Sequence, residues 1–328
     1  MFKYTRFEAA PIEGLRKPQA VSYTALKMFE ESPEEFYIRY LAEVKTPRPP
    51  QQPYMAVGSA FDALIKNRIH VDVYGFEATK GTDYELPRIM ESQVEEDFRE
   101  IVVPLAEDLF EQYVESGAYA SLLADILPAT ELGMEFTVTR EVGGVPLMGK
   151  PDLRFVTECG LHLITDFKVN GSMSKTGASP QVGYRICHDY GSRTHGQAHK
   201  RFVGKRNGGI LVSETPMDVT TSYWAEQLSM YAWLCGEEVG SQKFVVRIEQ
   251  IACRPVKGRS YPRAKFAQHV AHVSEEAQHT LLARLQACWL ACQTGHVFPE
   301  LTLENNNARL KGIGSRPIDF GSIDQNWD

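Results

Sequence analysis

The hydrophobic period of the chain changes near residue 132, and this change constrains the fold more than any other feature of the sequence. From Met134 onward apolar and polar residues alternate, and Gly143-Gly144 provides a two-residue turn into the next apolar run. A second group of turn residues, 157–160, leads into a third run. We therefore expect antiparallel strands at about 132–141, 145–157 and 161–169.

These strands carry three charged residues that can meet in space. Asp166 and Lys168 are two residues apart, so their side chains share one face of a strand. Asp152 lies in the preceding strand and can come alongside them. Carboxylate oxygens beside an ammonium group are suited to holding a divalent metal. A surface ion pair is the alternative that these residues leave open.

Helices are expected before the strands. Ser22 has the character of a helix N-cap, and after a proline-rich break residues 54–66 form a helix with small residues on one side, where another element could pack closely. Asp62 is the one acid in this apolar run, and a solvent-facing acid is the common alternative to a functional one. Residues 88–126 are a long acidic helical region, in which Pro104 starts a new helix or kinks this one.

A polar segment, residues 170–213, follows the strands. From Lys168 to Arg206 the chain has eight basic residues and one acid, Asp189, although its net charge is −7. Positive charge follows phosphates and aromatic rings stack on bases, so the segment is suited to bind DNA. A solvated loop without a ligand is the alternative. The residues expected to contact DNA are Lys175, Arg185, Arg193, Lys200, Arg201, Lys205 and Arg206.

Helical spacing returns at residues 222–234, where Gln227 and Tyr231 are four apart and share a face. The sequence then predicts strands at 243–254 and 266–273 and a helix at 274–292. This order of elements predicts an α/β fold, with a mixed β-sheet flanked by helices.

We expect one structural domain with three regions. A helical N-terminal region, 1–130, contributes the helix 54–66 to the site. The core spans residues 131–300, and an irregular tail spans 301–328.

Composition limits the class of protein. Apolar residues at 43% and charged residues at 23% are typical of a soluble globular protein. The sequence has neither an apolar run of membrane-spanning length nor a signal-peptide h-region, so we expect a cytoplasmic protein without membrane contact. The six cysteines include no CxxC pair, which disfavours a zinc site and a disulfide framework. No P-loop motif is present, so a helicase motor would be a separate chain.

The motifs resemble, in order and spacing, those of the PD-(D/E)XK nuclease superfamily, particularly its RecB-like and phage exonuclease branch. Gly149-Lys150-Pro151-Asp152 is similar to motif II, Asp166-Phe167-Lys168 to motif III, and Gln227-x-x-x-Tyr231 to the Q-x-x-x-Y motif. The helix from Gly58 to Ile65 resembles the G-x-x-x-H-x-x-L helix of that branch, with Asp62 in place of histidine.

The resemblance implies a restriction-endonuclease-like core with a helical N-terminal addition, and the activity of a metal-dependent DNA nuclease. It implies one or two Mg²⁺ or Mn²⁺ ions, whose ligands would be Asp62, Asp152, Asp166 and the backbone carbonyl of Phe167. Glu135, in the strand before motif II, is either a further ligand or an outward-facing residue of a half-buried strand.

The resemblance also implies roles for three catalytic side chains. Lys168 would orient the attacking water or offset the phosphate charge, and it would act as a general base only if its pKa falls far enough. The helix face with Gln227 and Tyr231 would lie over the active site. No iron–sulfur cluster is expected, because Ser32-Pro33 stands where iron–sulfur members have Cys-Pro and no C-terminal cysteine trio follows.

The leading hypothesis is a Mg²⁺- or Mn²⁺-dependent exonuclease of recombination, repair or phage DNA processing, located in the host cytoplasm if a phage encodes it. Its partners would be DNA ends or single strands and a recombination or single-strand-annealing protein, and an oligomer is compatible with the sequence. One alternative is a catalytically silent protein of this fold that binds DNA or a protein, which the intact Asp152, Asp166 and Lys168 disfavour. Another is a nuclease directed at RNA, because RNA contains the same phosphodiester.

Overall fold

The computed structural model describes residues 12–44, 50–134, 136–170, 185–186, 205–207, 210–212, 222–254 and 263–314. The chain divides into two compact units, whereas the sequence favoured one structural domain. The smaller unit contains Met1–Arg48, Gly143–Leu147 and Leu282–Asp328, and the larger contains Pro49–Val142 and Met148–Leu281. The smaller unit joins N-terminal and C-terminal segments, and local sequence patterns contain no information about such a distant pairing.

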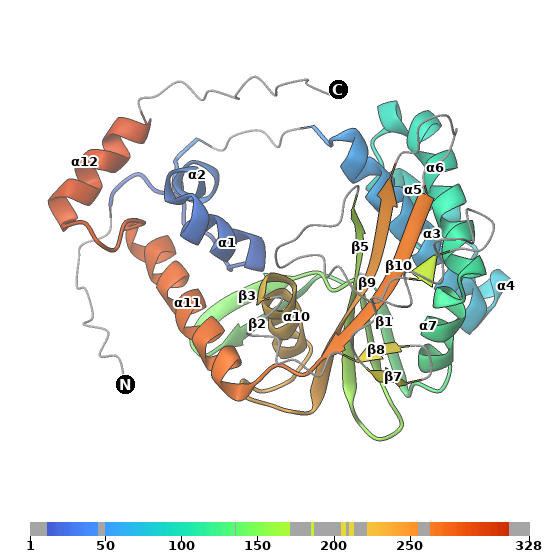
Figure 1. Ribbon diagram of the computed structural model, residues 1–328. Coiled ribbons are helices and arrows are strands. Elements are labelled where there is room, and N and C mark those ends of the chain that lie inside the picture. Colours follow the sequence, from blue (N-terminus) through green and yellow to red (C-terminus); the bar gives the residue numbers. More distant parts are fainter. Residues whose placement is uncertain are drawn as a thin grey trace. The chain divides into compact units, whose positions relative to one another are not determined.

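The larger unit is built on an eight-stranded mixed sheet, with the order β1-β4-β5-β9-β10-β8-β7 and with β6 paired to β10 (Figure 1). β5 runs parallel to β9 and β10 runs parallel to β8, and the other described pairs of this sheet are antiparallel. The predicted mixed sheet is therefore confirmed. Its strands are β1 (Glu131–Met134), β4 (Leu153–Val156), β5 (His162–Asn170), β6 (Arg185–Ile186), β7 (Lys205–Asn207), β8 (Ile210–Val212), β9 (Phe244–Arg254) and β10 (Arg263–Ala271).

Two of the strands expected before residue 160 are each divided in the structure. The first becomes β1 and β2 (Val138–Val142), and the second becomes β3 (Val145–Gly149) and β4. β2 and β3 form a two-stranded sheet around Gly143-Gly144, whose φ angles of 57° and 80° favour glycine. Pro151 follows β3, and proline cannot donate a ladder hydrogen bond. β1, the other part of the first expected strand, pairs with β4 in the large sheet.

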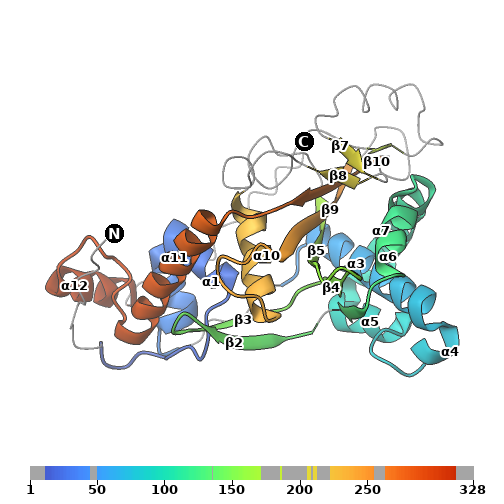
Figure 2. The ribbon, with the colours of Figure 1, turned by 90° about the horizontal axis from the view of Figure 1, so that it is seen from below.

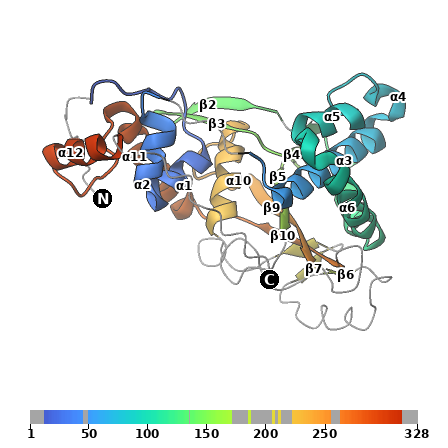
Figure 3. The ribbon, with the colours of Figure 1, turned by 90° about the horizontal axis from the view of Figure 1, so that it is seen from above.

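Helices cover both faces of the large sheet. In all three views α3, α5, α6 and α7 lie on one face and α10 lies on the other (Figure 1, Figure 2 and Figure 3). Pro104 lies inside α6, which continues through it as one helix. The described helices of the larger unit are α3 (Pro53–Tyr74), α4 (Phe76–Thr79), α5 (Leu86–Gln93), α6 (Glu96–Glu115), α7 (Ala118–Ile126) and α10 (Ser222–Leu234).

The small residues of α3 let it approach the sheet closely, as the sequence predicted. Ala56, Ala60 and Ala63 are fully buried. A Cβ atom placed on Gly58 would lie 3.6 Å from the Cβ of Val169 in β5, which is an ordinary van der Waals contact. Because α3 rests against β5, side chains of α3 can reach the end of the sheet that carries the acids.

On the face of the sheet that α6 and α7 cover, β9 contributes to a buried polar network. Arg247 and Glu249 are at most 1% exposed. The guanidinium of Arg247 lies 2.7 Å from the carboxylate of Asp125 in α7, and the hydroxyl of Tyr113 in α6 donates to Glu249 over 3.1 Å. Both faces of this central strand are covered, so its polar residues are buried together with its apolar ones.

The smaller unit is helical. Ser22 Oγ accepts a hydrogen bond from the N–H of Ala25 over 3.2 Å, which confirms the predicted N-cap. The carboxylate of Glu30 pairs with Arg284 over 2.6 Å and thus links the first helix to a C-terminal one. The helices of this unit are α1 (Tyr23–Glu31), α2 (Pro33–Phe36), the π-helical turn η1 (Tyr37–Leu41), most of α11 (Glu275–Thr294) and α12 (Leu303–Gly314).

α12 corrects the expectation of an irregular tail from residue 301. Asn306, Leu310 and Ile313 are buried at helical spacing, and the N–H of Asn306 donates to the carbonyl of Thr302 over 2.8 Å. Three consecutive asparagines obscured this pattern, because asparagine favours turns when no tertiary contact supports a helix. Within the described ranges, no helix combines the length and the apolar content that a membrane span requires.

Candidate active site

The antiparallel pairing of β4 with β5 brings Asp152 beside the predicted triplet. Leu153 is paired with Thr165. Asp152, one residue before Leu153, therefore lies beside Asp166, one residue after Thr165. Asp152 Oδ2 accepts a hydrogen bond from the backbone N–H of Phe167 over 3.0 Å. Lys168 Nζ lies 2.6 Å from Asp166 Oδ2. The two acids and the lysine therefore form one cluster where β4 begins, beside the second half of β5.

A residue that the sequence reasoning missed completes this cluster. Lys66 is one helical turn after Asp62 in α3 and is only 1% exposed. Its ammonium forms an ion pair with Asp62 Oδ2 and lies 3.5 Å from Asp152 Oδ1. The available signal was a lysine four residues after an acid in an otherwise apolar helix, a spacing that allows an ion pair. The structure thus places Asp62 in the cluster, paired with Lys66.

α10 brings Gln227 and Tyr231 to the same region. Gln227 Nε2 donates to the hydroxyl of Tyr231 over 2.8 Å. Burial raises the pKa of Tyr231, the hydrogen bond from Gln227 opposes the rise, and the negative charges of Asp166 and Asp152 add to it. The ring of Tyr231 therefore lies within electrostatic reach of both acids.

Gly149 allows this close approach. A Cβ atom at this position would lie 2.5 Å from Cε1 of Tyr231 and 2.8 Å from Cδ1 of Leu234, which is closer than packed atoms can be. The glycine that precedes Lys150-Pro151-Asp152 in the motif is therefore required by the packing of α10 on the end of β3.

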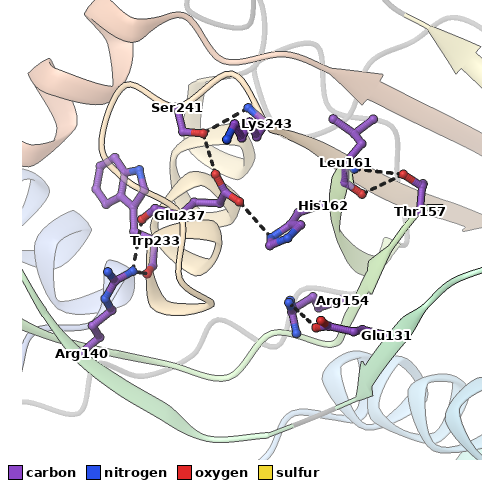
Figure 4. A network of polar contacts seen from close by, with 10 residues as sticks. All are labelled: Glu131, Arg140, Arg154, Thr157, Leu161, His162, Trp233, Glu237, Ser241 and Lys243. Carbon is purple, nitrogen blue, oxygen red and sulfur yellow. Dashed lines mark hydrogen bonds and ion pairs between the residues drawn. The ribbon is translucent and has the colours of Figure 1, made fainter. Parts of the chain in front are cut away.

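The far end of α10 is also held by polar contacts (Figure 4). Arg140 of β2 donates to the carbonyl of Trp233 over 2.7 Å and to that of Glu237 over 3.2 Å. The carboxylate of Glu237 lies 3.0 Å from His162 Nδ1 at the start of β5 and accepts a hydrogen bond from Ser241 over 2.5 Å. These contacts tie the C-terminal end of α10 to the sheet and so hold Tyr231 in place.

The charges of the cluster determine its protonation state. Burial raises the pKa of Asp166 to about 7; Lys168 opposes this rise and Asp152 adds to it. Burial also acts to raise the pKa of Asp152, but Lys66 and Lys168 outweigh burial and the pKa is lowered. The two carboxyl groups are close enough that the charge of Asp152 contributes to the raised pKa of Asp166.

Lys168 is an ammonium group in this environment. Burial acts to lower its pKa, but Asp166 and Asp152 more than offset burial, and the pKa is raised. Lys168 can donate hydrogen bonds to a phosphate or a water. Its action as a general base would first require that the charges of the two carboxylates be neutralised.

Asp152 and Asp166 fit a divalent cation. Asp152 accepts the N–H of the residue after Asp166 and the charge of Asp152 raises the pKa of Asp166, so a divalent cation near both would relieve the repulsion between them. The backbone carbonyl of Phe167 would be a third oxygen donor. Among the residues that the structure describes, no group of three or more His, Cys, Asp or Glu side chains has the arrangement of a metal site. Asp62, the expected additional ligand, is paired with Lys66.

Several predicted site residues fall outside the described residues or have only a described backbone. Glu135, Lys175, Arg193, Lys200 and Arg201 lie outside the described residues. The backbones of Arg185 in β6 and of Lys205 and Arg206 in β7 are described, and these strands add to the edge of the sheet beyond β9. The polar segment therefore contains short strands that the sequence did not predict, because only pairing with β10 and β8 stabilises them.

The larger unit therefore has a mixed sheet with helices on both faces, with Asp166 and Lys168 in β5 and Asp152 directly before β4. A family model described as the PD-(D/E)XK nuclease superfamily matches residues 20–186. The match covers half of the chain, and the chain belongs to this superfamily. Its members are nucleases, and they generally use divalent metal ions. No curated protein sequence matches significantly.

Two solved structures show a distant likeness. One is a candidate exonuclease from Eubacterium rectale, with a TM-score of 0.41 and 14% identity over 84% of this chain and 82% of that chain. The other is SSO0001, with a TM-score of 0.25 and 10% identity over 80% of this chain and 84% of that chain. At these scores neither likeness carries a functional argument.

Proposed function

We propose that this chain is a Mg²⁺- or Mn²⁺-dependent deoxyribonuclease that hydrolyses phosphodiester bonds from DNA ends in the cytoplasm, in recombination, repair or phage DNA processing. The observation that carries the proposal is the cluster of Asp152, Asp166 and Lys168 beneath α10. Membership of a nuclease superfamily supports hydrolysis of nucleic acid. The basic segment that follows β5 supports a polyanionic substrate, and DNA is the polymer that we propose.

The acids would hold the cation. Asp152 and Asp166, with the backbone carbonyl of Phe167, supply the hard oxygen ligands that Mg²⁺ and Mn²⁺ prefer. When bound there, the ion would activate water and stabilise the charge of the leaving oxygen. Asp152 is suited to this role because its lowered pKa keeps it ionised at neutral pH.

The other residues would position the substrate. Lys168 would place its ammonium against the phosphate, where it offsets the charge that develops during hydrolysis. The hydroxyl of Tyr231 and the amide of Gln227 are linked by a hydrogen bond of 2.8 Å, so each orients the other. Together they would orient the scissile phosphate or the attacking water from the α10 side.

The test is degradation of end-labelled DNA by the wild type and by Asp166→Ala, in Mg²⁺ and after chelation with EDTA. Asp83→Ala is the matched control, because Asp83 is an exposed aspartate elsewhere in the same unit. We expect the wild type and the control to degrade DNA in Mg²⁺ only, and Asp166→Ala to be inactive. Equal degradation by the wild type and Asp166→Ala would refute the proposal.

Three substrates separate the finer parts of the proposal. Linear duplex DNA should be degraded, and covalently closed circular DNA of the same sequence should remain intact. Cleavage of the circle would show an endonuclease. An RNA of the same sequence should be degraded more slowly than the DNA, and the reverse order would show that RNA is the substrate.

A further inference from the structure

Lys66 is an unusual residue for its surroundings. It is 1% exposed and lies in α3 among the fully buried side chains of Ala63, Ile65 and Ile69. A buried ammonium is costly unless opposite charges accompany it. The burial of Lys66 therefore indicates that nearby acids balance its charge and that this charge has a role in the site.

The partners of Lys66 come from two different elements. Its Nζ atom forms an ion pair with Asp62 of α3 and lies 3.5 Å from Oδ1 of Asp152, which precedes β4. The other oxygen of Asp152, Oδ2, accepts the N–H of Phe167 over 3.0 Å. One ammonium thus lies between two carboxylates on the side of Asp152 that faces α3.

The charges of the cluster favour the binding of one divalent ion over the binding of two. The cluster contains three carboxyl groups, of Asp62, Asp152 and Asp166, and two ammonium groups, of Lys66 and Lys168. With all three carboxyl groups ionised the net charge of these groups is −1, and one divalent ion would change it to +1 and a second ion to +3. A second ion beside Asp62 would meet the ammonium of Lys66 at short range, and the low dielectric of a buried site strengthens that repulsion.

We propose that Lys66 is a fixed internal cation that takes the place of a second metal ion, so that the site holds one divalent ion and Asp62 neutralises Lys66 instead of binding metal. This inference rests on the proposed metal site. The ammonium is a compact charge with three donors, which suits it to bridge two carboxylates. α3 holds it there, because α3 packs directly on β5.

The test counts the Mn²⁺ ions bound by the full chain without DNA, from the electron paramagnetic resonance signal of free Mn²⁺ and from calorimetry. We expect the wild type to bind one ion. Lys66→Met removes the charge at nearly constant length and should bind two, because Asp62 and Asp152 are then left without the ammonium. Lys80→Met removes an exposed lysine with a side chain 51% exposed and should bind one ion.

The double variant Asp62→Asn/Lys66→Met decides the role of Asp62, because it removes both charges together and leaves neither of them buried without its partner. We expect it to bind one ion at least as tightly as the wild type does, whereas loss of a true ligand would weaken binding about tenfold or more. Asp62→Asn alone leaves the charge of Lys66 beside Asp152, so it should bind one ion more weakly than the double variant does.

Several outcomes would overturn the inference. Two ions in the wild type would refute it while leaving the proposed nuclease site intact. A tenfold loss of affinity in the double variant Asp62→Asn/Lys66→Met, or a single ion in a folded Lys66→Met, would do the same. A wild type that binds no Mn²⁺ would refute the metal site itself, and the inference with it.

Discussion

Replacement of Glu249 by glutamine tests the buried polar network that joins β9 to α6 and α7. Glu249 accepts hydrogen bonds from Tyr113 over 3.1 Å and from Gln268 over 2.8 Å, and Arg247 Nε lies 3.3 Å from its carboxylate. Burial raises its pKa to about 7, although Arg247 opposes the rise. Glutamine has the same shape as the protonated acid, and the Tyr113 hydroxyl can accept from the new amide. The substitution therefore removes the titration and keeps the packing.

The expected effect follows from the two pKa values. The ordinary pKa is 4.5 and the value in the folded chain is about 7, so between these limits the folded state keeps a proton that the unfolded state has lost. The free energy of unfolding therefore falls as pH rises, by about 1.4 kcal/mol per pH unit and by about 3 kcal/mol in all. This contribution is fully present below pH 4.5 and is lost above pH 7. The glutamine variant has no such loss. The difference between its free energy of unfolding and that of the wild type should therefore rise by about 3 kcal/mol from pH 4.5 to pH 8.

Urea unfolding at pH 4.5, 5.5, 6.5, 7.5 and 8 measures this difference. Subtracting the two curves cancels the titration of Asp166, which both proteins retain. Glu107→Gln is the control, because Glu107 is exposed on α6, and it should follow the wild type at every pH. If the curves of the wild type and Glu249→Gln run parallel, the reasoning about the buried carboxyl is wrong.

Other changes probe the candidate site. Because burial raises the pKa of Asp166 to about 7, a metal must displace its proton at lower pH; calorimetry should show Mn²⁺ affinity falling about tenfold per pH unit below 7 and constant above it. Gly149→Val forces carbon atoms into the ring of Tyr231 and should cost about 1–3 kcal/mol in urea unfolding. Gly58→Ala makes only an ordinary contact and should be neutral or stabilise α3 by up to about 1 kcal/mol, and a reversal of this order would contradict the packing argument. Arg140→Ala leaves two carbonyls at the end of α10 without this donor and should destabilise the chain by about 1–2 kcal/mol, with a fall in nuclease rate that Arg140→Lys partly restores.

Local patterns predicted elements more accurately than pairings. The Gly143-Gly144 turn and the helix at residues 222–234 were predicted correctly, because turn residues and hydrophobic periods act over a few neighbouring positions. The division of the expected strands was not predicted, since β1 finds its partner in β4 across the intervening hairpin. Pro104 did not interrupt α6, because the packing of a long helix outweighs the loss of one hydrogen bond.

Buried polar residues were the hardest to predict. Helices cover both faces of the sheet at β9, and Arg247 and Glu249 are buried as a consequence. The short strands β6, β7 and β8 depend on pairing at the edge beyond β9 and have no pattern of their own.

The sequence by itself determined that Asp166 and Lys168 share a strand face, that a hairpin carries Asp152 to them, and that Gln227 and Tyr231 share a helix face. Each of these relations follows from the geometry of a single strand, turn or helix. Only the tertiary structure decided that α3 delivers Lys66 between Asp62 and Asp152, and that Gly149 admits Tyr231 to the cluster. Those relations depend on how separate elements pack, and packing brings together charges and surfaces that lie far apart along the chain.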